Sequence, residues 1–417
     1  MQVTKLKLYA AIVLTLCAIF VLNVGAQNKN KKNKVVTEYL DRVDKKDVYV
    51  NRQLPMVHMK GYLRLVEEIP MPGEGYYDQG TYDLKTMRQF ISGEDDNTLI
   101  TVDMKAGKVI HVTKLPGSPR RAFFVPNTNE VWVDLGQGEN TVVAVDGTTL
   151  EIVKTVELTD GKGANNRDAD NGAFDYAKGL FYISATYASL GTCRVPGPGP
   201  CAPASIMDVV DTKTAKLVGT ITLKGLEPQG VVIEPDGKRL YVGMGDMVNG
   251  ESWVNVIDTE KRQVIATWTA TGAPQIHIGG LDPTHRRLFM GGRQKGGHGG
   301  EPDKLAVMDA DTGKVIQVLD APGGIDEILY DEASKRIYVA GTTGTVGVYH
   351  QDDPDHYRLL GLFPVGPNAK TGIWIPELKR YYAAVPKFMS KPLTPMRPMT
   401  DEWIVKDAHL EVFEAIP

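Results

Sequence analysis

Cysteine is scarce in this chain of 417 residues, which has only three. So few cysteines exclude a fold held together by a disulfide framework, and no paired Cys-x-x-Cys motif of a structural zinc site is present. The sequence also has no His-Glu-x-x-His, Gly-x-Ser-x-Gly or Cys-x-x-Cys-His motif. It therefore carries no signature of a zinc protease, a serine hydrolase of the nucleophile-elbow type or a c-type haem protein.

A strong net charge and helical periodicity are missing as well. The 47 basic and 51 acidic residues give a net charge of −4, which is too small to imply a nucleic acid or a membrane surface as partner. Beyond the first residues, no segment repeats apolar side chains with the 3.6-residue period of an amphipathic helix. The 43 glycines and 25 prolines instead indicate a globular chain that is rich in turns.

The N-terminus has the pattern of an export signal. Lys5 and Lys7 precede an almost wholly apolar run over 8–22, and small residues follow at 24–26. The alternative is an uncleaved membrane anchor, but the apolar run is shorter than the ~20 residues that a spanning helix needs. We therefore predict a signal peptide over 1–26, and no membrane span after its cleavage.

Cleavage would leave a chain beginning at Gln27. Its first residues, QNKNKKNK, are basic and lack apolar periodicity, so we interpret 27–59 as a solvated tether. Localisation in the periplasm or secretion from the cell follows as an expectation.

Export also bears on the oxidation state of the two cysteines that remain after cleavage. Cys193 and Cys201 flank a spacer with three prolines, which cannot form the interior of a helix or strand. In an oxidising compartment, two cysteines that close such a short loop predict a disulfide. A two-thiolate metal site would need further ligands, which the neighbouring sequence does not offer.

One structural unit recurs along the rest of the chain. It consists of a short apolar strand, a tight turn, a second strand, a variable loop, a third strand ending at a fixed mark, a turn and a last strand. The marks lie between 41 and 65 residues apart and are Asp103, Asp146, Asp211, Asp258, Asp309, His350 and Glu414. Aspartate predominates because its side chain can bond backbone N–H groups two residues further on and so start a turn.

Repeats of ~40–50 residues with four short strands are typical of β-propeller blades. We therefore predict an all-β fold over 60–417, a seven-bladed β-propeller with four-stranded blades. The last copy lacks a fourth strand, whereas Tyr62–Pro70 stands alone before the first complete copy. We expect this N-terminal strand to pair in the last blade, closing the ring and removing an exposed edge. We expect the chain to be a monomer.

Three stretches carry a family resemblance: SWVNVIDTEKRQVIATW, KLAVMDADTGKVIQVLD and NTLITVDMKAGKVIHVTKL. They resemble the YVTN-repeat propellers, a group similar to lactonase-like and quinoprotein-type propellers. The stretch IDEILYDEASKRIYVAGTTGTVGVYHQDDPDHYRLLGLFPV resembles an exported bacterial branch of that group. The second strands depart from the motif, reading YVGM, FMGG and YVAG. The resemblance implies an exported bacterial propeller, and because this fold hosts many activities it implies no single function.

The long insertions in the repeats are expected on one face of the predicted propeller. In a propeller, the loops between second and third strands and those between blades lie on one face, and the long insertions fall among these loops. They span 74–80, 160–170, 184–204, 243–252, 291–303 and 386–408. Because loops on a rigid scaffold tend to carry function, we expect a small molecule or a protein partner to bind on this long-loop face.

Alignment of the first strands places a polar residue at one equivalent position in every copy. We call this set the polar ring: Asp78, Arg120, Asp170, Gln229, His277, Asp326 and Lys370. The following position adds Asn171 and Glu327. A convergent polar ring at the mouth of a channel predicts a ligand site. The alternative is that these side chains only pair with one another and with trapped water.

Two kinds of chemistry are open to this ring. Asp170, Gln229 and Asp326, with Asn171 and Glu327, offer the oxygen ligands that Ca²⁺ prefers. His277, oriented by a carboxylate, could act as a general base.

The sequence leaves three hypotheses for the function. We favour a binding or interaction module of the cell envelope. The alternatives are a calcium-dependent lactonase-like hydrolase and a propeller subunit of a periplasmic redox enzyme.

Overall fold

The computed structural model describes residues 62–73, 75–159, 167–187, 205–225, 227–245, 251–293, 302–366, 368–387 and 407–416. The predicted signal peptide, the tether up to residue 59 and the Cys193–Cys201 loop lie outside the described residues. All described residues belong to one compact unit, made of Tyr49–Met389 and Ile404–Pro417. Its regular elements are β-strands, and the described ranges hold no helix that is long and apolar enough to cross a membrane.

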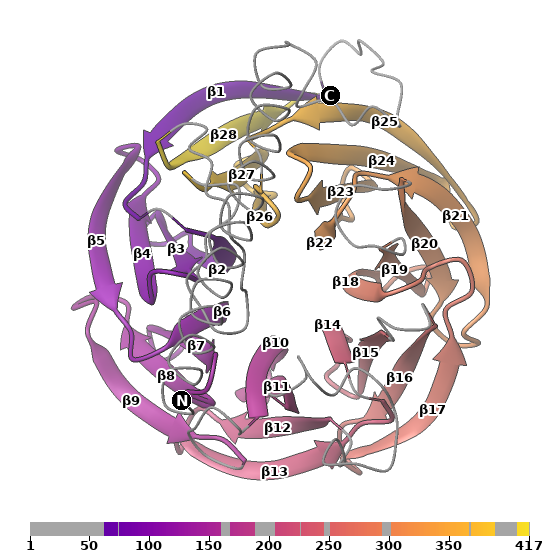
Figure 1. Cartoon of the computed structure of the whole chain (residues 1–417), viewed down its shortest axis with the longest axis horizontal. Coiled ribbons are helices and arrows are strands. Elements are labelled where there is room, and N and C mark those ends of the chain that lie inside the picture. Colours follow the sequence, from indigo (N-terminus) through magenta and orange to yellow (C-terminus); the bar gives the residue numbers. More distant parts are fainter. Residues whose placement is uncertain are drawn as a thin grey trace, which may run out of the picture. The chain divides into compact units, whose positions relative to one another are not determined.

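The strands of the described residues form repeated antiparallel sheets (Figure 1). One sheet has eight strands, in the order β5-β4-β3-β2-β6-β7-β8-β9, and its two halves meet through a single parallel pair, Gln79 with Arg121. Its strands are β2 (Tyr77–Asp83), β3 (Arg88–Gly93), β4 (Thr98–Asp103), β5 (Lys108–Lys114), β6 (Ser118–Val125), β7 (Glu130–Gly136), β8 (Thr141–Asp146) and β9 (Ile152–Glu157).

Four further sheets have four strands each, paired in chain order. They are β10 (Arg167–Asp175), β11 (Leu180–Tyr187), β12 (Ile206–Asp211) and β13 (Lys216–Thr222); β14 (Glu227–Ile233), β15 (Arg239–Gly245), β16 (Ser252–Asp258) and β17 (Gln263–Thr269); β18 (Ile276–Asp282), β19 (Arg287–Gly292), β20 (Asp303–Asp309) and β21 (Val315–Ala321); and β22 (Ile325–Asp331), β23 (Arg336–Gly341), β24 (Thr345–Asp353) and β25 (His356–Pro364). The predicted repetition of four-stranded units is therefore present.

The last sheet unites the two ends of the described chain. Its strands are β26 (Gly372–Ile375), β27 (Arg380–Val385), β28 (His409–Ala415) and β1 (Leu63–Pro70), and β1 pairs antiparallel with β28. Arg64 lies opposite Glu414, and the two side chains form an ion pair at 2.5 Å. The N-terminal strand thus occupies the outer position of this sheet.

The first strand of each four-stranded unit faces a common opening in Figure 1. Contacts join β2 with β6, β6 with β10, β10 with β14, β14 with β18, β18 with β22, β22 with β26, and β26 with β2. Equivalent positions of these strands are therefore brought around one axis.

The apolar core lies between the faces of successive sheets. Phe90 and Leu99 of the first unit pack with Phe124 and Val131 of the next, and the Phe90 and Phe124 rings stack at 6.1 Å. Strands with both faces covered read as continuous apolar runs, as β8 does, whereas the outer β17 alternates between exposed and half-buried residues. Burial of these faces is the main stabilising contribution to the fold.

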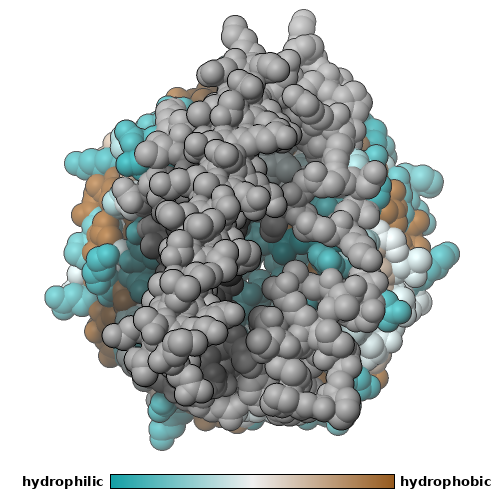
Figure 2. Space-filling view, viewed as in Figure 1, coloured by the Kyte–Doolittle hydropathy of each residue, from teal (hydrophilic) through white to brown (hydrophobic). Residues whose placement is uncertain are grey.

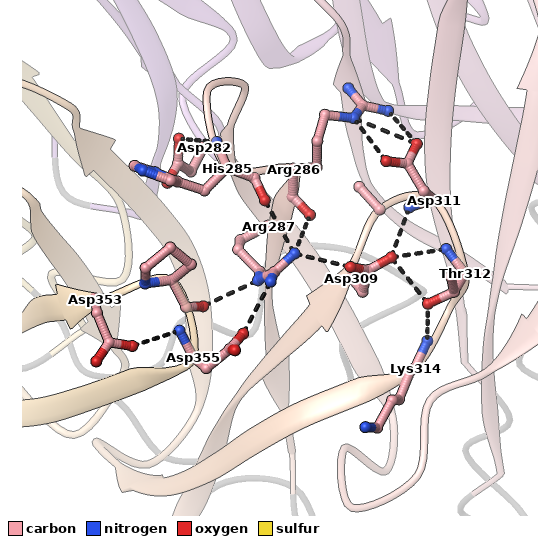
Figure 3. Close-up of polar contacts among 12 residues, drawn as sticks. Asp282, His285, Arg286, Arg287, Asp309, Asp311, Thr312, Lys314, Asp353 and Asp355 are labelled. Carbon is pink, nitrogen blue, oxygen red and sulfur yellow. Dashed lines mark hydrogen bonds and ion pairs between the residues drawn. The ribbon is translucent and has the colours of Figure 1, made fainter.

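The aspartates that end third strands start the hairpin turns, as the sequence predicts. Asp309 Oδ1 accepts hydrogen bonds from the backbone N–H groups of Asp311 and Thr312 at 3.1 and 2.8 Å (Figure 3). The same pair of backbone bonds is made by Asp103, Asp146, Asp211 and Asp258. Each carboxylate thereby satisfies two turn amides that would otherwise lack a partner.

Ion pairs join neighbouring sheets on the face of these short turns (Figure 3). Arg287 contacts Asp309 of its own sheet and Asp355 of the next, both at 2.8 Å. Arg286 contacts Glu234 of the preceding sheet at 2.7 Å and Asp311 at 2.9 Å. Charged side chains on this face therefore link neighbouring sheets.

Several expected loops are shorter than the sequence indicated. The strand β2 starts at Tyr77, β10 starts at Arg167 and β11 runs to Tyr187. Likewise, β15 runs to Gly245 and β19 to Gly292. These ends contain Gly, Asp or Thr, which look like loop residues in the sequence, but pairing with the adjacent strand extends them into the sheet.

Candidate functional site

The strand register places the polar ring at the end of the sheets where second strands finish. Asp78 lies opposite Ser92, and His277 lies opposite Gly291. The second strands β11, β15, β19 and β27 end on this side, at Tyr187, Gly245, Gly292 and Val385, and the predicted long insertions follow them in the sequence. Figure 2 shows hydrophilic residues inside the central opening where it is not covered. The ring therefore belongs to the long-loop face.

A β-bulge lies at the ring position or directly beside it in six of the first strands described. The pairing register shifts between Asp78 and Thr81, Pro119 and Ala122, Ala169 and Gly172, Pro228 and Val231, Ile278 and Gly280, and Ile325 and Glu327. Bulges free residues from the ladder and redirect their side chains, and they are common beside functional sites. Here they release ring residues or their neighbours from strand pairing.

The bulges have a recurrent support from the second strands. Ser92 Oγ donates to the carbonyl oxygen of Gln79 at 3.1 Å, and Ser184 Oγ donates to that of Asn171 at 3.1 Å. In the sheet between them, Asp134 Oδ1 instead accepts from the backbone N–H of Arg121 at 2.7 Å. One position of the second strand thus satisfies the backbone that the bulge leaves without a ladder partner.

Lys370 is the centre of the charge network in the ring. Its Nζ lies 2.9 Å from Asp326 Oδ2, 3.3 Å from Glu94 Oε2 and 3.4 Å from Asp78 Oδ2. The lysine side chain is only 11% exposed, so these contacts are poorly screened by solvent. One cation therefore joins acids from two other four-stranded units, β2–β5 and β22–β25.

Arginines complete the network on both sides of Lys370. Arg120 forms an ion pair with Glu94 and lies 3.9 Å from Asp78 and 4.0 Å from Asp168. Arg293 forms an ion pair with Asp326 and donates through Nε to the Ile325 carbonyl oxygen at 2.6 Å.

The residues that directly follow ring positions in the sequence form another ion pair. Arg121 Nη1 lies 3.5 Å from Glu327 Oε1. Acidic and basic residues therefore alternate along part of the ring, from Asp326 to Asp170, whereas Gln229 and His277 interrupt this order.

Burial sets the protonation of these acids. It raises the pKa of Asp78 to about 8 against the opposing charge of Lys370, and that of Glu327 to about 7 against Arg121. It also raises the pKa of Asp170 to about 6 and that of Asp134 to about 7. Several carboxyl groups therefore exchange protons near neutral pH.

Asp326 behaves in the opposite way. Burial alone would raise its pKa, but the charges of Lys370 and Arg293 outweigh burial and hold the pKa well below its usual range. Its Oδ2 contacts Lys370 and its Oδ1 contacts Arg293. Asp326 is thus an ionised acceptor whose oxygens are already engaged.

His277 is not suited to be a general base. Burial and the positive charge of Arg293 lower its pKa to about 3, and its Nδ1 has no hydrogen-bond partner among the described residues. A catalytic base works best with a pKa near the operating pH, and no carboxylate of the described residues forms a hydrogen bond with this imidazole. The ring therefore keeps His277 neutral and shielded from solvent.

Within the described residues, the carboxylates of the ring do not meet as ligands of one cation. Over the described ranges, the ring supplies no three histidine, cysteine or carboxylate ligand atoms that lie within 4.8 Å of one another. The oxygens of Asp326 face cationic side chains instead, whereas Ca²⁺ requires 6–8 free oxygen ligands.

The predicted site residues are brought together to different degrees. Asp78, Arg120, Asp326 and Lys370 share direct ion pairs. Asp170 and His277 interact electrostatically with Lys370, and Glu327 joins through Arg121.

Two predicted residues stand apart from these pairs. Gln229 is half-buried, and no hydrogen bond given for the described residues joins its side chain to the network. Asn171 is buried at a φ of 65° and contributes its backbone. Cys193 and Cys201 lie outside the described residues.

Sequence reasoning missed four members of the network. Glu94 and Arg293 each follow the glycine that ends a second strand, in ISGE and MGGR, so an alignment of second strands would have found them. Asp134 occupies the position of Ser92 and Ser184 in that alignment. Asp168 precedes the aligned position and gave no signal of its own.

Comparisons with known proteins support the fold. No family model and no curated protein sequence matches the chain. A chain of the hydrazine synthase of Kuenenia stuttgartiensis is similar, with a TM-score of 0.60 and 16% identity, over 81% of this chain and 96% of that one. A chain from the mitotic checkpoint complex has a TM-score of 0.63 and 11% identity, over 87% of this chain and 98% of that one.

The fold and the ring together define a class. The chain is an all-β propeller-type protein whose first strands start in a ring of paired charges. As many as 1696 chains of solved structures match, so likeness of fold alone does not select one function.

Proposed function

We propose that this protein is a non-catalytic binding module whose long-loop face, with the polar ring at its centre, receives a protein partner. The observation that supports the proposal most is the mutual pairing of Lys370, Asp326 and Arg293. A ring whose charged side chains pair with one another is rigid and presents a fixed pattern of charge. Such a pattern confers specificity on a polar partner surface.

The catalytic alternative has weaker support from the same geometry. A lactonase-like hydrolase would need a free cation site or a base, whereas Asp326 is engaged and the pKa of His277 is about 3. The ring is thus better suited to recognition than to chemistry.

Site-specific photo-crosslinking in the native cell tests the proposal. A photoreactive residue at Gln229, which is half-buried on the ring face, is expected to give a discrete adduct with one protein. The matched control is the same residue at Lys314, which is exposed on the short-turn face (Figure 3). Arg121→Glu should weaken the Gln229 adduct. Equal adducts from both positions, or none from Gln229, would count against a partner on this face.

A second candidate is a subunit that packs its outer strands against a larger enzyme. Outer strands of the described units carry exposed apolar residues, namely Leu65, Val66, Ile110, Val112, Ile152, Val153, Val218, Ile265 and Val318. Apolar patches on a surface can mark partner contacts. If Val153→Lys abolishes co-purification with a partner while Arg121→Glu does not, this candidate replaces the first.

We further propose a closed ring of seven blades. The eight-stranded sheet supports this count because one parallel residue pair joins its two halves, and the β1–β28 pairing supports closure. Membership of the YVTN-repeat propellers remains part of the proposal, as does a monomeric state.

Export to the periplasm or beyond is proposed from the N-terminal pattern. Mass spectrometry of the protein from its native cells should find Gln27 as the first residue and a Cys193–Cys201 disulfide. An intact N-terminus would contradict cleavage, and free thiols would contradict the disulfide.

A further inference from the structure

Three potential metal ligands meet on the sheet that joins the two ends of the described chain. Glu68 of β1 lies directly opposite Glu411 of β28, and Pro70 lies opposite His409. His409 and Glu411 are two residues apart in one strand, so their side chains leave the same face. One ligand atom from each of Glu68, His409 and Glu411 lies within 4.8 Å of the others.

The orientation of the histidine suits a metal ligand. His409 Nδ1 lies 2.7 Å from the carbonyl oxygen of Asp407, and because a carbonyl oxygen only accepts, Nδ1 must donate the proton. In the neutral imidazole this leaves the Nε2 lone pair directed at Glu411, whose Oε1 is 3.5 Å away. Hydrogen bonding of the second ring nitrogen to a carbonyl is the usual support of a metal-binding histidine.

A second observation points to a cation as the ligand of this cluster. Glu411 is only 9% exposed, and its Oε2 is buried without a hydrogen-bond partner among the described residues. A lone pair and a carboxylate that face each other repel unless a positive charge lies between them. Burial of such a carboxylate without compensation is costly.

We propose that Glu68, His409 and Glu411 bind a divalent transition metal, with Zn²⁺ as the best fit. One imidazole nitrogen and two carboxylate oxygens match the borderline preferences of zinc and provide three ligands with a fourth position left for water. Calcium fits poorly because it requires 6–8 oxygens. The ion would clamp β1 to β28 and so fasten the N-terminal strand to the sheet.

This role predicts that zinc stabilises the folded protein, since only the folded chain brings β1 and β28 together. We expect the untagged, chelator-treated chain to melt several degrees higher when micromolar zinc is added. Calorimetric titration should give one zinc per chain, and calcium at the same concentration should have no effect.

Substitutions separate this site from other zinc-binding groups. Glu411→Gln removes one ligand and a buried charge with little change of shape, so it should fold and bind zinc at least ~10-fold more weakly. The matched control is Glu414→Gln, which alters the exposed Arg64 pair on the same two strands and should keep the zinc response. Asp326→Asn in the polar ring should keep it too.

Two results would overturn the site. Either the wild-type chain does not respond to zinc, which would mean that a protonated His409 pairs with Glu411, or Glu411→Gln binds zinc as tightly as the wild-type chain does. Neither result depends on the proposed partner face.

Discussion

At the scale of single residues, the charges beside each buried acid, rather than its residue type, decide its protonation in the ring. Asp78 and Asp326 both contact Lys370, yet the pKa of Asp78 rises to about 8 while that of Asp326 falls. The difference arises because Arg293 forms a direct ion pair with Asp326, whereas Arg120 stays 3.9 Å from Asp78. The neighbouring acids Glu94 and Asp326 also raise the pKa of Asp78. Identical side chains at equivalent positions therefore acquire different charges.

Asp134 offers a direct test of this electrostatic description. Burial raises its pKa to about 7, and its Oδ2 has no hydrogen-bond partner among the described residues. A carboxyl group whose pKa is higher in the folded state than in the unfolded chain destabilises the fold as the pH rises through the folded pKa. Asp134→Asn removes that charge and keeps the shape of the side chain.

The free energy of unfolding of Asp134→Asn should therefore exceed that of the wild-type chain by more as the pH rises. We expect similar free energies of unfolding near pH 4, and an advantage for Asp134→Asn of up to about 4 kcal/mol at pH 8.5. Urea unfolding at both pH values measures the gap. An equal gap at the two pH values would show that Asp134 does not change its protonation in this range.

At the scale of elements, the hairpins follow from local sequence chemistry. Asp146 Oδ1 accepts from the backbone N–H groups of Thr148 and Thr149 at 2.8 and 2.7 Å. Asp146→Ala removes both bonds and should lower the free energy of unfolding by ~1 kcal/mol, while Asp146→Asn retains an acceptor and should lose less than half of that. Chemical denaturation distinguishes the two, and equal losses would rule out the turn as the cause.

The bulges make stricter demands on the backbone. Gly230 has a φ of 75°, and a Cβ added there would lie 1.9 Å from the carbonyl oxygen of Ile278 in the next sheet. Gly245 lies in the same sheet, but the nearest atom to an added Cβ is 3.6 Å away.

Gly230→Ala should therefore cost at least ~3 kcal/mol, whereas Gly245→Ala should stay within ~1 kcal/mol of the wild-type chain. Thermal melting with far-ultraviolet circular dichroism measures both. If Gly230→Ala is as stable as Gly245→Ala, the bulge does not approach its neighbour as described.

The repeat is the part of the fold that could be predicted from sequence. Hairpin aspartates such as Asp309 act within a few residues, so their pattern predicts the turns and the number of strands between them. The alignment also brought Asp78, Asp326 and Lys370 to one position. The bulges could not be predicted, because a register shift depends on pairing with a second strand.

At the scale of the whole molecule, the partners of the ring residues depend on how the sheets approach one another. Lys370 and Asp78 are 292 residues apart in the chain but 3.4 Å apart in space. No local pattern indicates which of the neighbouring acids a lysine will contact. Glu94 and Arg293 directly follow second strands, so an alignment of first strands alone did not include them.

The central claim is that the first strands start around one opening, where Lys370 joins sheets from the beginning and the end of the chain. Double-mutant cycles measure this most directly, by combining Lys370→Met with Asp326→Asn in one cycle and with Glu94→Gln in the other. Both acids contact the same amine, at 2.9 and 3.3 Å. We predict coupling energies of ~1–3 kcal/mol in both cycles, and additivity within ~0.5 kcal/mol when Lys370→Met is combined with Asp211→Asn in a hairpin. Additive effects with Asp326 and Glu94 would contradict the convergence of the sheets on one charge network.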